Sequence, residues 1–151
     1  MNPAHALPVL PRRNATIALL AVAIASALRA AEPTLQAAVQ QWAGTTVPRE
    51  GRVTLLIAEL VENGNAVPIT VSVDSPMTAA DHVTEIALFN QRNPQREVAR
   101  FEFGPHNGRA EVSTRIRLAT SQRLVALARR NDGSVWQHQV DVLVTLAACI
   151  E

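Results

Sequence analysis

Tyrosine and lysine are absent from the sequence, and aromatic residues make up only 3% of its 151 residues. The core must therefore be aliphatic, and Val, Leu, Ile and Ala supply most of a hydrophobic content of 48%, which is ordinary for a globular protein. The formal net charge is only +1, so no basic excess points to nucleic acid as a partner. The length fits one domain.

Cysteine is almost absent as well. A single residue, Cys149, excludes an internal disulfide framework and a cysteine-rich metal site. The histidines at 82, 106 and 138 lack metal-ligand spacing, so we expect each to be solvated or hydrogen-bonded within the fold. Nucleophile-elbow, P-loop and dinucleotide-binding motifs are also missing. We therefore predict no catalytic residue, no metal and no cofactor, and a protein that is not an enzyme.

The first 30 residues differ from the rest. Arg12 and Arg13 precede an apolar run from Ala15 to Leu28, and Ala25-Ser26-Ala27 fits a cleavage site for signal peptidase. These are the three parts of a secretory signal peptide. The paired arginines leave the twin-arginine route open. We predict a signal peptide over 1–30, a periplasmic mature protein and no membrane segment in that mature form, since the apolar run is short for a span.

Residues 31–146 alternate between helical and strand periodicity. Apolar residues from Thr34 to Trp42 have helical spacing, with Thr34 and Gly44 as caps. A period of two then predicts strands over 53–57, 67–73, 83–90, 97–103, 110–118, 124–129 and 135–146. We expect Pro68 at a sheet edge or strand start because it has no N–H to donate. Thr78 to Asp81 resembles a capping box and predicts one helical turn.

Short strands separated by turn residues, with almost no helix, favour an antiparallel β-sandwich. The sequence has no Cys…Trp…Cys core of the antibody type. The predicted fold class is therefore all-β, an immunoglobulin-like sandwich with a short N-terminal helix. Trp42 and Trp136 are expected to pack against its body.

Cys149 follows the last predicted strand almost at once. Terminal residues are loose unless something ties them down, so this thiol lies where the chain can reach out of the domain. A buried apolar cysteine is the alternative. A redox enzyme using this thiol is a weaker one, because no second cysteine is available to resolve it.

Several segments, in order and with similar spacing, resemble one family. They are Glu62 to Thr78, Asn93-Pro94, Glu97 to Phe101, Gly108 to Leu118 and Asp132 to Trp136. The sequence is similar to SoxY, the periplasmic carrier subunit of bacterial thiosulfate oxidation. The resemblance implies an immunoglobulin-like sandwich that pairs with a second sandwich, SoxZ, as a heterodimer. It also implies covalent attachment of the sulfur substrate at Cys149, which is then presented in turn to other sulfur-oxidation enzymes.

The family's C-terminal arm reads Gly-Gly-Cys-Gly-Gly, whereas residues 147–151 read Ala-Ala-Cys-Ile-Glu. Alanine removes most of the positive-φ states open to glycine, so we expect a stiffer arm. Two functions are therefore open. One is a carrier of sulfur intermediates on Cys149. The other is a diverged interaction module that no longer carries substrate.

Overall fold

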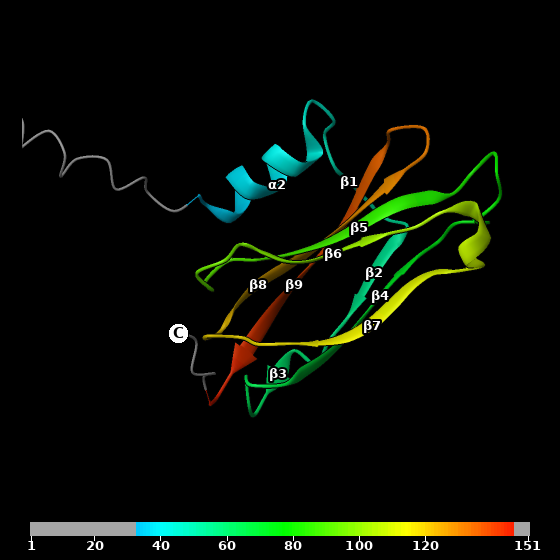
Figure 1. Cartoon of the computed structure of the whole chain (residues 1–151). Coiled ribbons are helices and arrows are strands. Elements are labelled where there is room, and N and C mark those ends of the chain that lie inside the picture. Colours follow the sequence, from blue (N-terminus) through cyan, green and yellow to red (C-terminus); the bar gives the residue numbers. More distant parts are fainter. Residues whose placement is uncertain (1–32, 147–151) are drawn as a thin grey trace, which may run out of the picture. The chain divides into compact units, whose positions relative to one another are not determined.

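The computed structural model describes residues 33–146 of the chain (Figure 1). The predicted signal peptide at 1–30 and the predicted arm at 147–151, with Cys149, lie outside the described residues. Within the compact unit that starts at Pro33, two β-sheets face each other with one helix beside them.

The larger sheet has the strand order β1-β9-β8-β5-β6, and β3 also pairs with β9. The smaller sheet has the order β2-β4-β7. All pairs are antiparallel except the short β1–β9 and β3–β9 pairs. The strands are β1 (Arg49–Glu50), β2 (Val53–Leu56), β3 (Leu60–Val61), β4 (Val67–Val73), β5 (Val83–Asn90), β6 (Glu97–Glu102), β7 (Ala110–Ile116), β8 (Gln122–Arg130) and β9 (Val135–Val144). The predicted all-β sandwich is confirmed.

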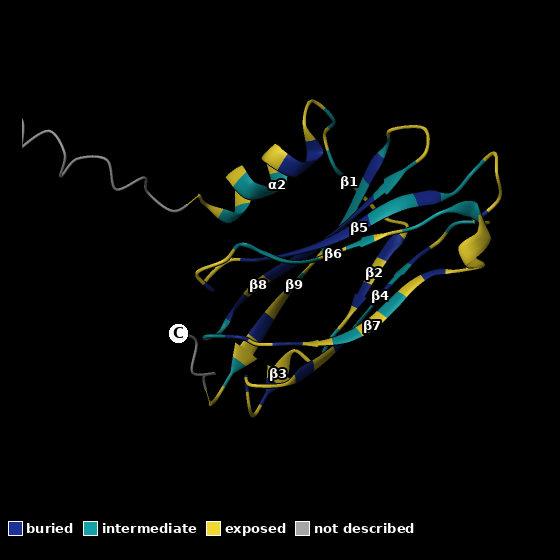
Figure 2. Cartoon of the chain, in the orientation of Figure 1, coloured by how far each residue is buried: buried dark blue, intermediate teal, exposed yellow. Residues whose placement is uncertain are grey.

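Alternating side chains build the core between the sheets (Figure 2). In β4, Val67, Ile69, Val71 and Val73 are buried, opposite Ile86 and other buried residues of the large sheet. The other face of β7 is exposed and polar, as its alternation predicted. Burial of aliphatic area therefore stabilises this sandwich, with aromatic rings confined to its margins.

Helix α2 (Leu35–Ala43) begins and ends where its caps predicted. The hydroxyl of Thr34 accepts a hydrogen bond from the amide of Ala37, and Gly44 has a φ of 67°. Such a left-handed residue ends a helix at little cost only as glycine. The buried Trp42 ring lies edge-on to Phe89, with 6.5 Å between ring centroids, and its Nε1 donates to Glu85 Oε1 at 2.8 Å. The helix is thus fixed to β5.

Trp136 packs against the core, as expected, but from one side only. The guanidinium groups of Arg49 and Arg52 lie over its ring, 5.6 and 5.3 Å from the centroid. Gly51 between them has a φ of 105°, which side chains rarely adopt. The segment 49–52 therefore closes over the indole by cation–π contact.

The helical turn expected over Thr78 to Asp81 is wrong. The Thr78 amide donates to the Asp81 carbonyl at 2.9 Å, and Thr78 Oγ1 accepts from the Asp81 amide at 3.1 Å. The hydroxyl therefore makes the expected cap bond, but the backbone bond runs in the direction opposite to that of a helix. Pro68, in contrast, lies near the start of β4, beyond the last residue that β2 pairs.

A buried polar network centres on Asn93. Its Nδ2 donates to the Arg117 carbonyl, and its Oδ1 accepts from the Ala119 amide and from Gln122 Nε2, all within 2.7 to 3.0 Å. The Asn93 amide in turn donates to Asn90 Oδ1 at 2.9 Å. These bonds join the β5–β6 loop to the β7–β8 loop, which explains the value of an asparagine in a tight turn here.

Candidate functional site

The candidate site is the end of β9, because this strand leads to Cys149. Hydrogen bonding continues past the last strand residue. The Thr145 amide donates to the Val61 carbonyl at 3.0 Å, and the Leu146 amide donates to the Glu62 carbonyl at 3.2 Å. The Gly64 amide donates back to the Leu146 carbonyl at 2.8 Å. The backbone is therefore held up to Leu146, three residues before Cys149.

The opposite side of β9 is held by a side chain. Beyond the β8–β9 ladder, which ends at Gln122 and Val142, Ser121 Oγ accepts a hydrogen bond from the Val144 amide at 2.9 Å. The strand end is thus bonded on both sides, since β3 lies along its other edge. A terminal strand tied in this way does not fray readily.

Exposed leucines surround this strand end. Leu60 and Leu143 are direct partners in the parallel β3–β9 pair and are 60% and 63% exposed. Leu146 is 61% exposed, and Leu56 on β2 is 58% exposed. Leu56 also lines a groove of about 490 Å³ between β2 and β9, together with Glu59 and His138 among others. The site is therefore apolar at its surface.

His138 takes part in this groove through its fold contact. Its Nδ1 accepts a hydrogen bond from the Leu55 amide at 2.9 Å, which links β9 to β2 across the open edge of the sandwich. His82 Nδ1 lies 3.0 Å from the Thr78 carbonyl. Within residues 33–146, no group of three His, Cys, Asp or Glu residues is arranged to hold a metal ion. The histidines that can be described are satisfied within the fold or exposed.

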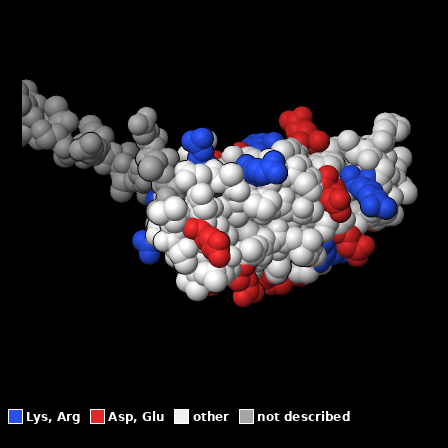
Figure 3. All heavy atoms as spheres, turned by 90° about the horizontal axis from the view of Figure 1, so that it is seen from below, with Lys and Arg blue, Asp and Glu red and all other residues white. Residues whose placement is uncertain are grey.

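An exposed ion pair lies beside the site. Arg123 on β8 and Asp141 on β9 are directly opposite, with Nε–Oδ1 and Nη2–Oδ2 distances of 2.7 and 2.8 Å. The hydrogen bonds from Arg123 lower the pKa of the Asp141 carboxyl below its ordinary value. On the face of the molecule in Figure 3, acidic and basic groups are interspersed and much of the surface is uncharged.

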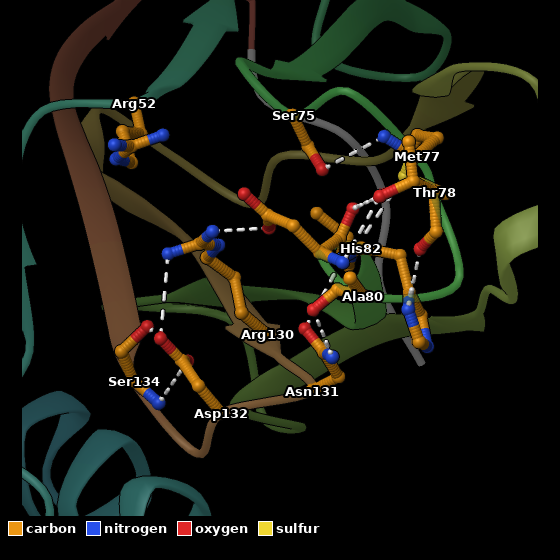
Figure 4. Close-up of polar contacts among 12 residues, drawn as sticks. Arg52, Ser75, Met77, Thr78, Ala80, His82, Arg130, Asn131, Asp132 and Ser134 are labelled. Atoms are coloured by element: carbon orange, nitrogen blue, oxygen red, sulfur yellow. Dashed lines mark hydrogen bonds and ion pairs between the residues drawn. The ribbon is translucent and has the colours of Figure 1, made fainter.

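A second polar cluster lies at the other end of β9 (Figure 4). Arg130 pairs with Asp81 and with Asp132, and Asn131 Nδ2 donates to the Ala80 carbonyl at 2.9 Å. The hydroxyl and amide of Ser134 hold the pKa of Asp132 below its usual range. These contacts join the β4–β5 loop to the β8–β9 hairpin, so the cluster is a structural joint.

Comparison with known families decides what kind of protein this is. The family model described as "Sulfur oxidation protein SoxY" matches residues 39–149, which covers most of the chain and reaches Cys149. The chain belongs to the SoxY family. A comparison with curated protein sequences gives no match. The predicted resemblance to SoxY is thereby confirmed.

Solved structures agree with the SoxY fold. The sulfur carrier protein SoxY from Chlorobium limicola f thiosulfatophilum is similar at 29% identity and a TM-score of 0.63, covering 75% of this chain and 97% of that one. Superoxide reductase (neelaredoxin) from Ignicoccus hospitalis is similar at 23% identity and a TM-score of 0.56, covering 61% and 78%. Superoxide reductase from Nanoarchaeum equitans is similar at 15% identity and a TM-score of 0.53, covering 64% and 100%. The reductases show the same fold alone.

Part of this SoxY site was hidden from sequence reasoning. Cys149 was identified from its position and its resemblance, and it lies outside the described residues. The exposure of Leu60 and Leu143 was missed, because aliphatic residues in a strand pattern predict core. In the described part of this SoxY chain, no helix has the length and apolar character needed to cross a bilayer.

Proposed function

We propose that this SoxY-family protein is a carrier that holds a sulfur intermediate covalently on Cys149 during thiosulfate or sulfur oxidation. The observation that carries the proposal is the extent of the family match, which runs to the single cysteine of the chain. The backbone bonds that end at Leu146 support it, because they leave this cysteine just beyond the bonded body.

The chemistry asks little of the carrier itself. Joining thiosulfate to the Cys149 thiol forms a sulfur–sulfur bond and releases one proton and two electrons. A separate oxidising enzyme has to accept those electrons. The carrier in this proposal supplies the thiol and catalyses no step. It works in the periplasm after export, paired with a SoxZ-like sandwich subunit, and it meets the other sulfur-oxidation enzymes in turn.

Intact mass spectrometry tests the carrier function. Protein purified without reductant from cells grown on thiosulfate should carry a sulfur adduct that reductant removes. The Cys149→Ser variant, which differs by one atom, should carry none and should abolish thiosulfate-dependent growth. A wild-type Cys149 without adduct under every sulfur source would sink the proposal.

The second candidate is an interaction module that carries no substrate. The arm composition favours it, because Ala147, Ala148, Ile150 and Glu151 stand where the family has glycine. In that case Cys149→Ser would leave sulfur oxidation unchanged, whereas deletion of the whole protein would not.

A further inference from the structure

We infer that the exposed leucines at the end of β9 form the docking surface for the enzymes that process the cargo on Cys149. This leucine surface consists of Leu60, Leu143 and Leu146. The inference rests on the proposed carrier function and adds to it where such a partner sits and what chemistry it presents.

The surface is contiguous by strand pairing. Leu60 and Leu143 are paired across β3 and β9, so their side chains point to the same face. Leu146 follows three residues later, where its backbone is bonded to Glu62 and Gly64. Each of the three is more than half exposed, although Val61 and Val142 beside them are buried. Clustered exposed leucines of this kind mark surfaces that another protein covers.

Chain length places the partner on this surface. An extended chain advances at most about 3.3–3.6 Å per residue, so the Cα of Cys149 lies within about 10 Å of the Cα of Leu146. Leu146 itself is held by its backbone bonds. An enzyme that encloses the Cys149 sulfur must therefore bring the rim of its active site against the end of β9.

The charges around the surface describe that rim. Glu59 and Glu62 are exposed, and neither carboxylate forms an ion pair with another described residue. Asp141 is already neutralised by Arg123. The expected partner thus has an apolar collar around its active-site entrance, flanked by Lys or Arg side chains that face Glu59 and Glu62.

The test follows the cargo in cells that produce the full chain. After a pulse of thiosulfate, intact mass spectrometry measures how fast Cys149 gains and loses its adduct. We expect Leu143→Glu, alone or with Leu60→Glu, to slow both steps at least tenfold, because it places a charge in the apolar contact. Val47→Glu is the matched control, since Val47 is 75% exposed and lies in the α2–β1 loop. Its rates should stay within twofold of wild type.

Two further measurements separate docking from other causes. Thermal unfolding and the rate of Cys149 alkylation by iodoacetamide should be the same for Leu143→Glu and Val47→Glu. The Glu59→Gln, Glu62→Gln double variant should slow the adduct steps and weaken their dependence on salt.

Three outcomes would overturn the inference. Wild-type adduct rates in Leu143→Glu and the double leucine variant would show that the enzymes dock elsewhere while the carrier function stands. Loss of the partner subunit or a changed oligomeric state, with unchanged rates in the remaining complex, would assign the leucines to a subunit interface. A wild-type chain that never gains an adduct would remove the carrier function and this inference with it.

Discussion

The carbonyl oxygen of Leu146 accepts a hydrogen bond from the amide of Gly64 at 2.8 Å. The Gly64 carbonyl in turn accepts from the Leu118 amide at 2.8 Å, so the turn after β3 bridges the end of β9 and the end of β7. This relationship holds the base of the Cys149 segment to both sheets. Any reach of the thiol must come from the residues after Leu146.

The first prediction concerns the other bond at this strand end. Ser121→Ala removes the acceptor of the Val144 amide. A net hydrogen bond is worth about 0.5–1.5 kcal/mol, so we expect hydrogen exchange at Val144 to become up to about tenfold faster. Ser113→Ala is the control, because Ser113 only meets Thr70 on an exposed face. Equal protection of Val144 in both variants would show that Ser121 does not hold the strand.

The second prediction concerns the Asn93 network. Asn93→Ala leaves the Arg117 carbonyl, the Ala119 amide and Gln122 Nε2 without this partner. Each polar group left unsatisfied when buried costs about 1–3 kcal/mol, so we expect unfolding free energy to fall by at least about 2 kcal/mol. Urea denaturation measures it. Gln95→Ala, at an exposed position in the same loop, should change stability little.

The third prediction concerns helix α2. Trp42→Phe keeps an aromatic ring against Phe89 but removes the Nε1 donor to Glu85. A hydrogen bond to a charged group contributes about 1.5–3 kcal/mol, so we expect a loss of about 2 kcal/mol in urea denaturation followed by circular dichroism. Trp136→Phe removes only a 3.3 Å contact to Ser134 Oγ. Equal losses in the two variants would contradict a specific role for the Trp42–Glu85 bond.

The fourth prediction concerns pH. The pKa of Asp141 is lowered in the folded protein by its hydrogen bonds from Arg123. The pair therefore stabilises the fold above the unfolded pKa of about 3.9, and that contribution disappears as pH falls through the lower folded value. NMR titration should give Asp141 a midpoint below that of an unpaired aspartate, and Arg123→Gln should return it upward. An unchanged midpoint in Arg123→Gln would show that the pair is not formed in solution.

The strands could be predicted because apolar residues alternate through them. The β7 sequence places Ala110 and Ile116 on one face and Glu111 and Arg115 on the other, and burial follows that division. Strands β1 and β3 were missed because two residues carry no period, and each forms only by pairing with β9. The turn at Thr78 to Asp81 was misassigned because one hydroxyl–amide bond is compatible with both a helix cap and an open turn.

The Asn93-Pro94 pair shows a different limit. The sequence marked it as part of a family resemblance, but its reason is visible only in three dimensions, where Asn93 bonds to the loop around Arg117 and Ala119. Those residues are more than 20 positions apart, so no local pattern relates them.

The sequence by itself determined the fold class, the SoxY resemblance and the choice of Cys149, since periodicity, ordered motifs and a unique thiol are properties of the chain alone. Only the tertiary structure decided how far the body extends toward that thiol and which leucines stay exposed beside it. Leu143 and Val142 are neighbours of similar polarity, and the pairing of β9 with β3 and β8 sets which of them faces solvent. The surface next to Cys149 is therefore a product of packing.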